Sequence, residues 1–301
     1  MWLLFAFSGP VLWAASTHID KYLVEKYFKD SPVAVLLIFT ALIGIVMLPF
    51  IWYFQPQVLA LAAGSVAVVG ASGVLYMGAM LFYLQALQTE EASAVAPLFQ
   101  AAPLFAYALG YALLGETLSA RQTGGGLLIV CGALLISLDT SFRLKQMKAR
   151  LLLLMLAAAF ALALSSVIFK LFAVEDEFWN TVFWQYAGEA LFGLALLCVP
   201  LYRRQFAALL RTNTGAVLAV NTANELINLG GGLGVRYAML LAPLAIVQAI
   251  SSTSTLFVFL FGILLTLFSP ALGRENLSLQ NLIQKGFSAV LIAIGVILIN
   301  L

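Results

Sequence analysis

Long apolar stretches separated by short polar connections make up most of this chain. A bilayer core of about 30 Å needs about 20 apolar residues per helix, so each stretch of that length predicts a membrane-spanning helix. Cutting the chain at its polar breaks predicts ten helices, at residues 2–22, 33–54, 64–87, 92–114, 121–139, 151–173, 179–200, 215–239, 243–268 and 282–300. Because little chain is left between them, no extramembrane domain is expected and function must lie within the bundle.

Composition narrows the class of protein further. Of 301 residues, 63% are hydrophobic and 9% are charged, with a net charge of +2, whereas a soluble domain carries about a quarter charged residues. The chain is therefore expected to be an all-α integral membrane protein that binds no nucleic acid. Cys131 and Cys198 lie in apolar runs and His18 is the single histidine. We accordingly expect no metal, no cofactor, no catalytic residue and no enzymatic activity.

The two halves of the chain resemble each other weakly. Four residues of the first half recur at an offset of 149: Ser16, Ile19, Lys21 and Gly44 match Ser165, Ile168, Lys170 and Gly193. We therefore predict two five-helix repeats, residues 1–145 and 146–301. Because each repeat has an odd number of spans, the copies cross the membrane in opposite senses, as in many secondary transporters. The predicted architecture is two inverted repeats around a central cavity.

Several segments resemble the EamA family of the drug/metabolite transporter superfamily, over essentially the whole chain. They are residues 13–21, 94–105, 114–116 and the glycines 124–126, together with their counterparts in the second half. The resemblance implies ten helices in a basket around a cavity, alternating access, and movement of small metabolites such as amino acids. It does not choose the substrate.

Basic residues are unevenly divided between the two sides of the predicted bundle. Twelve of fifteen lie in or near odd-numbered connections: Lys21, Lys26, Lys29, Arg143, Lys145, Lys148, Arg150, Arg203, Arg204, Arg211, Arg274 and Lys285; Arg121, Lys170 and Arg236 lie on the other side. Since cytoplasmic loops carry the Lys and Arg excess, we expect a multi-pass protein of the cell (inner) membrane with both termini outside. Family members usually have both termini in the cytoplasm, so either this protein is inserted in the inverted sense, which we favour, or the segmentation is out by one span.

Two acidic residues fall inside predicted spans, where an ionisable group costs about 3 kcal/mol or more unless it faces a cavity or a partner. They are Glu189 and Glu225. Asn221, Asn224 and Asn228 share one helical face with Glu225, and this polar stripe must look inward. Each carboxylate either recognises a cation or couples a proton to transport, or it is structural and neutralised by Lys170 or Arg236. For Glu225 both interpretations stay open, whereas Glu189 favours structure.

Interrupted helices indicate where a substrate binds, because freed backbone groups and half-helix ends coordinate ligands at the midplane. Pro97 and Pro103 interrupt the fourth span, and a run of hydroxyl residues from Ser251 interrupts the ninth. The alternative is a proline kink with hydroxyls bonded to their own backbone. The predicted substrate-binding residues are Trp13, Tyr83, Gln100, Asn224, Glu225, Asn228, Gln248, Ser251 and Ser252, and the coupling candidates are Glu189, Glu225 and Lys170.

These features predict a secondary transporter for a small polar or zwitterionic metabolite, an amino acid or an amine, with proton coupling left open. No Walker A sequence occurs, so the driving force would be a gradient. The alternatives are a flippase for a lipid-linked substrate on the same fold and a non-transporting membrane assembly subunit. The expected partners are the bilayer and a small molecule, and both a monomer and a homodimer are compatible with the sequence.

Overall fold

The structure is a computed structural model of the chain. It describes residues 1–27, 34–89, 95, 98–137, 149–175, 177–212, 214–268 and 278–301. The predicted boundary between the two repeats, at residues 145 and 146, lies outside these ranges, as does Pro97.

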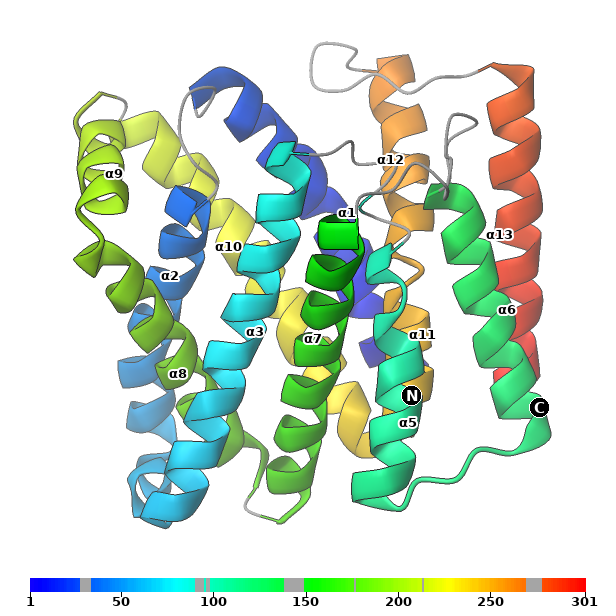
Figure 1. Cartoon of the computed structure of the whole chain (residues 1–301), viewed down its shortest axis with the longest axis horizontal. Helices are drawn as coiled ribbons and strands as arrows, with labels where there is room; N and C mark the ends of the chain where they lie inside the picture. The colour runs from blue at the N-terminus through cyan, green and yellow to red at the C-terminus, as the bar shows by residue number, and fades with distance from the viewer. Residues whose placement is uncertain are drawn as a thin grey trace.

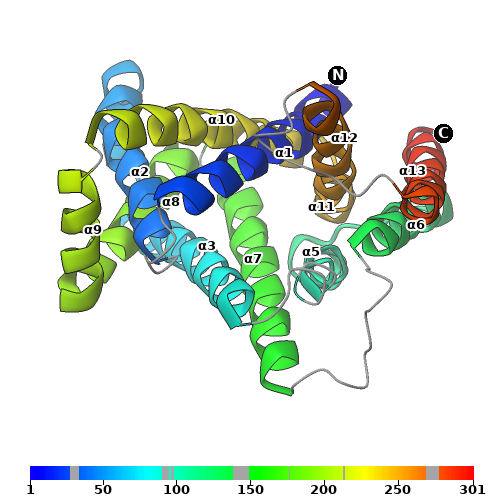
Figure 2. The same ribbon diagram turned by 90° about the horizontal axis from the view of Figure 1, so that it is seen from above.

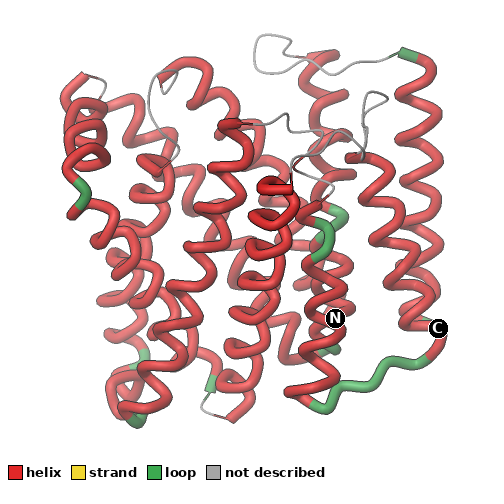
Figure 3. Tube along the Cα trace, viewed as in Figure 1, coloured by secondary structure: helices red, strands yellow, loops and turns green. Residues whose placement is uncertain are grey.

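The described residues form helices and no strand (Figures 1 and 3). The helices are α1 (Trp2–Tyr27), α2 (Ala34–Phe54), the short 3₁₀ helix η1 (Pro56–Ala60), α3 (Ala63–Thr89), α5 (Ala102–Leu114), α6 (Ala120–Ser137), α7 (Ala149–Glu175), α8 (Phe178–Cys198), α9 (Pro200–Thr212), α10 (Thr214–Leu241), α11 (Leu244–Ser251), α12 (Ser254–Phe268) and α13 (Leu279–Asn300). The predicted all-α membrane class is confirmed, because eight segments of the described chain are long and apolar enough to cross a bilayer. The count of ten crossings stays a prediction.

One helix was not anticipated. Helix α9 occupies a stretch that the hydrophobic pattern assigns to a polar connection, and it carries Arg203, Arg204 and Arg211 on its exposed surface. Its apolar side packs on the bundle through Phe206, whose ring centroid lies 4.9 Å from that of Phe39 in α2. A search for long apolar runs misses such a helix, because its apolar residues occupy one face only.

The helices pack in pairs that join the first and second halves of the chain. Helix α1 packs against α10, α3 against α7, α2 against α8, and α6 against α13. Viewed from above, α6 and α13 lie side by side at one end of the molecule and α2, α8 and α9 lie at the other (Figure 2). Helices α5 and α11, which contact each other, lie between these ends.

Glycines allow two helix pairs, α3 with α8 and α6 with α13, to approach backbone to backbone. A Cβ built on Gly188 of α8 would lie 1.9 Å from the carbonyl oxygen of Gly70 in α3. Gly125 of α6 and Gly295 of α13 face each other in the same way, each excluding a Cβ at 2.6 Å from the carbonyl oxygen of the other. Close backbone approach through small residues is a common way of packing membrane helices.

Two of the helical segments are interrupted near the middle of the bundle. A turn at Ser252 and Thr253 separates α11 from α12, and a turn at Gln100 and Ala101 precedes α5, with Pro103 in its first turn. The predicted interruption of the ninth span is confirmed, and that of the fourth span is confirmed in its described part. The polar residues flanking both breaks are thereby brought to the centre of the molecule.

Candidate functional site

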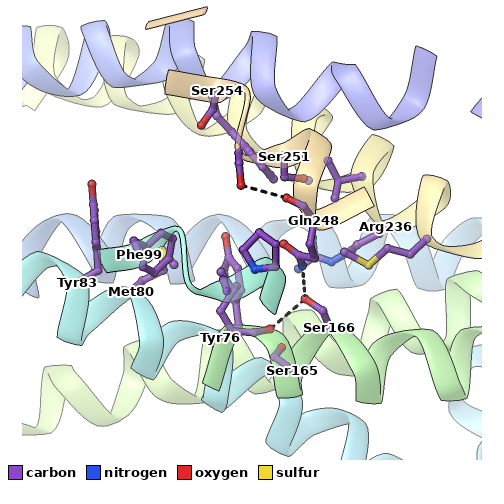
Figure 4. A pocket seen from close by; sticks show the side chains of 18 of the residues that line it. Tyr76, Met80, Tyr83, Phe99, Ser165, Ser166, Arg236, Gln248, Ser251 and Ser254 are labelled. Carbon is purple, nitrogen blue, oxygen red and sulfur yellow. Dashed lines mark hydrogen bonds between the residues drawn. The ribbon is translucent and has the colours of Figure 1, made fainter. Parts of the chain in front are cut away.

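A cavity of about 360 Å³ lies between the two interrupted segments. We call it the central cavity; eight helices, α1, α3, α5, α7, α8, α10, α11 and α12, contribute to its wall, together with the two turns. Figure 4 shows the side chains of many lining residues converging from these helices. Six predicted site residues line it: Trp13, Tyr83, Gln100, Gln248, Ser251 and Ser252.

Neutral polar groups form one wall of the central cavity. Gln248 of α11 donates a hydrogen bond of 2.9 Å to the hydroxyl of Ser166 in α7 (Figure 4). The hydroxyls of Ser251 and Ser252 bond to carbonyls of their own segment, at Val247 and Gln248. These two serines therefore bond to their own backbone, as the alternative interpretation from sequence expected, although both also line the cavity. Ser165, used in the sequence analysis only as a sign of repetition, and its neighbour Ser166 both line this wall, which sequence reasoning missed.

A second cavity, of about 230 Å³, shares part of its wall with the first. We call it the acidic chamber, and define it by Asp20 of α1, Thr40 of α2, Glu189 of α8, and Glu225 and Asn228 of α10. The wall common to both cavities is formed by Trp13, Tyr76, Met80, Tyr83, Gly232 and Arg236.

Glu225 is buried in this chamber and bonded to its neighbours. The hydroxyl of Thr40 donates a hydrogen bond of 2.7 Å to the Glu225 carboxylate, which is 4% exposed. The side-chain amide of Asn224 donates a bond of the same length to Asp20. Asn224 itself lines neither cavity, and it supports the chamber through this bond. The inward orientation of the polar stripe is confirmed, because Asn221, Asn224 and Glu225 are buried whereas Leu226, on another face of α10, is 55% exposed.

Arg236 of α10 connects the two cavities and binds three side chains of α8. It donates hydrogen bonds of 2.8, 2.9 and 2.7 Å to Gln185, to the hydroxyl of Tyr186 and to Glu189. The guanidinium carbon also lies 4.8 Å from the centre of the Tyr186 ring. Glu189 is thus neutralised by Arg236, as its structural interpretation requires.

Lys170 of α7 lies outside both cavities. Its ammonium group pairs with the Glu116 carboxylate at 2.5 Å and donates to the carbonyl of Ala242 at 2.7 Å. The other Glu116 oxygen accepts a 2.7 Å bond from the amide of Leu244, the first residue of α11. Glu116 therefore caps α11 and ties it to α7.

Two further residues considered from sequence lie at the edge of this region. The ring of His18 is within hydrogen-bonding distance, 3.0 Å, of the carbonyl of Val258 in α12. The side chain of Lys21 lies outside what the structure describes. Sequence reasoning missed Asp20 and Gln185 as cavity residues and treated Arg236 only as a neutralising partner; the signal available for Asp20 was its place one turn after Ser16 and Thr17.

Comparison with known proteins gives a family match for the first half of the chain and a fold likeness for the whole. Residues 1–138 match the model of a family described as the EamA-like transporter family. A solved crystal structure, described only as that of a protein, is similar over 98% of this chain and 94% of its own, with a TM-score of 0.66 and 16% sequence identity. It shows that the fold extends over both halves. No curated protein matches the chain. The first 138 residues of the chain are therefore similar to the EamA-like transporter family, a family of membrane transporters within the drug/metabolite transporter superfamily.

Proposed function

We propose that the protein is a secondary transporter that moves a small polar or zwitterionic metabolite, an amino acid or an amine, across the cell membrane by alternating access. The observation that carries this proposal is the central cavity, placed between two interrupted helices and lined by residues of both halves. Discontinuous helices near the midplane form the substrate sites of many secondary transporters. The cavity volume falls within the range of about 300–1,000 Å³ typical of small-molecule sites.

The pattern of helix contacts supports two inverted repeats, residues 1–145 and 146–301. In the repeat, α1 corresponds to α7 and α3 to α10. Exchanging the two halves therefore turns the contact of α1 with α10 into that of α7 with α3, and both contacts occur. The contacts of α2 with α8, α6 with α13, and α5 with α11 each map onto themselves. Gly44 and Gly193, matched in sequence, both lie at the contact between α2 and α8.

The contact between α3 and α8 departs strongly from this approximate symmetry, as expected of a transporter open to one side. Helices α3 and α8 are in close backbone contact at Gly70, Gly73 and Gly188. Their symmetry counterparts, α10 and α2, touch far less among the described residues, and the acidic chamber lies between them. Alternating access would exchange the tight and loose pairs.

Transport by the purified protein tests the proposal directly. Proteoliposomes would be offered a panel of radiolabelled amino acids and amines, with and without a pH gradient, beside protein-free liposomes. We expect saturable uptake of at least one solute. Uptake that depends on the gradient and is lost in Glu225→Gln would indicate proton coupling at Glu225, whereas uptake indifferent to both would indicate a facilitator. Stoichiometric retention of another protein after mild solubilisation, with no saturable uptake, would favour the assembly-subunit alternative.

A further inference from the structure

The acidic chamber holds more negative than positive charge. Arg236 is the one cationic side chain among its described lining residues, and it is already paired with Glu189 at 2.7 Å. Asp20 and Glu225 have no ion-pair partner in the part of the chain that the structure describes. Carboxylates removed from water in this way are costly unless a cation or sufficient hydrogen bonds compensate for them.

The same region also has more hydrogen-bond acceptors than donors. Thr40 and Asn228 hydrogen-bond to Glu225, and Ser16 and Asn224 hydrogen-bond to Asp20. Behind the chamber wall, the side-chain carbonyl oxygens of Asn224 and Asn221 have no partner among the described residues, although neither residue lines the chamber itself. A buried acceptor without a donor costs about 1–3 kcal/mol. Within the chamber, what Asp20 and Glu225 lack among the described residues is a cation, so a ligand that carries a positive charge and hydrogen-bond donors would complement them.

A primary ammonium group meets both requirements, because it has three donors and no acceptor. The wall shared with the central cavity adds Trp13, Tyr76 and Tyr83, whose aromatic faces attract a nearby cation. Beyond this wall, the central cavity offers rings and neutral amides and hydroxyls, and no carboxylate is among its lining residues. A ligand that extends from the acidic chamber past these shared residues into the central cavity therefore meets negative charge at one end and a neutral, largely apolar surface at the other.

We propose that Asp20 and Glu225 bind the ammonium group of a primary amine whose apolar or aromatic body occupies the central cavity. This inference rests on the proposed transport function and names its substrate class, an amine in preference to a metabolite without a positive charge. It also assigns to Asp20 a recognition role that its position near the end of a span does not suggest.

Calorimetric titration of the purified full-length protein in detergent tests the amine site separately from transport. The probes are 2-phenylethylamine and 2-phenylethanol, which share an aromatic body and differ in the ammonium group. We expect the amine to bind at least about tenfold more tightly than the alcohol. We also expect Glu225→Gln and Asp20→Asn each to weaken amine binding by about tenfold or more, since a desolvated charge pair is lost.

A matched carboxylate outside the cavities provides the control. Glu177 is exposed and lines neither cavity, so Glu177→Gln should leave amine binding within about twofold of that of the parent protein. Thermal unfolding midpoints would establish that each variant is folded, and either variant alone decides the question if the other does not fold. Equal affinities for the amine and the alcohol, or unchanged amine affinity in a folded variant, would overturn the site.

Flux of the same amine into proteoliposomes distinguishes the two proposals. Binding that depends on Asp20 and Glu225 without any flux would retain the amine site and contradict the transport function. Flux of other solutes that is insensitive to both substitutions would retain the transporter and overturn the amine site. Saturable amine flux lost in both variants would support the two proposals together.

Discussion

Charged side chains inside this bundle are stabilised by partners that are far away in the sequence. Arg236 pairs with Glu189, and Lys170 pairs with Glu116, across 47 and 54 positions respectively. Because ionisable groups buried in a membrane almost always pair with a partner, sequence can predict that such a pair forms. The identity of each partner depends on which helices are adjacent, and helix adjacency is not encoded in local periodicity. Sequence alone therefore identified both cations as potential partners of buried acids, but left the pairing of Glu189, Glu225, Lys170 and Arg236 open.

The Arg236–Glu189 pair should behave as a structural unit. Removing one member, in Glu189→Gln or Arg236→Met, leaves the other buried without its counter-ion, so each single variant should lose about 3 kcal/mol or more of stability. The double variant should lose clearly less than the sum of the two. Thermal unfolding followed by tryptophan fluorescence measures these differences. Strict additivity would show that the two side chains do not interact energetically.

Glu116 should stabilise the start of α11 by two separable contacts. Glu116→Gln keeps an oxygen for the Leu244 amide and loses the ion pair with Lys170, whereas Glu116→Ala loses both. We expect the alanine variant to be less stable than the glutamine variant by about 1 kcal/mol, the usual contribution of a helix cap. The same unfolding assay measures it, and identical midpoints for the two variants would contradict a capping contribution.

At the level of elements, the hydrophobic pattern was most informative where a helix is apolar on all sides. It placed helices such as α7 and α13 closely, and its proline and hydroxyl runs located the break between α11 and α12. It missed α9, because three arginines in thirteen residues look like a connection unless the apolar face is considered alone. Two further glycines, Gly125 in the run 124–126 and Gly231 in the run 230–234, lie at close helix contacts.

The contact between α3 and α8 should tolerate no side chain at Gly188. In Gly188→Ala the new methyl group would meet the Gly70 carbonyl oxygen at 1.9 Å, so the two backbones must separate and lose packing. We expect a loss of stability of about 1–3 kcal/mol, in the range seen for overpacked interiors. Gly78→Ala on α3 is the matched control, because a Cβ there meets nothing within 4 Å. Equal unfolding midpoints for the two variants would contradict this contact.

Among the residues that the structure describes, the bundle is closely packed where Lys170 and Glu116 pair, whereas the cavities reach exposed residues toward its opposite end. Phe169, Met239 and Leu244 are buried at the end where Lys170 and Glu116 pair. In contrast, Thr17 lines the central cavity and is exposed. The acidic chamber is lined by Leu37, near the start of α2, and Leu84, near the end of α3. Helix α9, with its three arginines, lies at this end of the bundle (Figure 1).

The positive-inside rule predicts that this accessible end faces the cytoplasm. Arg203, Arg204 and Arg211 of α9 and Arg150 of α7 are exposed there, whereas Arg121 lies at the opposite end and donates a hydrogen bond to the carbonyl of the terminal residue, Leu301. Because α9 and the C-terminus lie at opposite ends, a single measurement of sidedness assigns the orientation of the bundle and the side from which its cavity is reached.

Labelling of single cysteines by a membrane-impermeant maleimide makes that measurement. In a background where the exposed Cys131 and Cys198 are replaced by alanine, Thr17→Cys and Arg204→Cys should react in inside-out vesicles, and Leu301→Cys in right-side-out vesicles. Addition of 2-phenylethylamine should slow labelling at Thr17 and leave Arg204 unaffected, since only the former lines the cavity. Labelling of Arg204→Cys from outside would invert the predicted topology, and labelling of Thr17→Cys together with Leu301→Cys would place the entrance at the end that is closely packed in this structure.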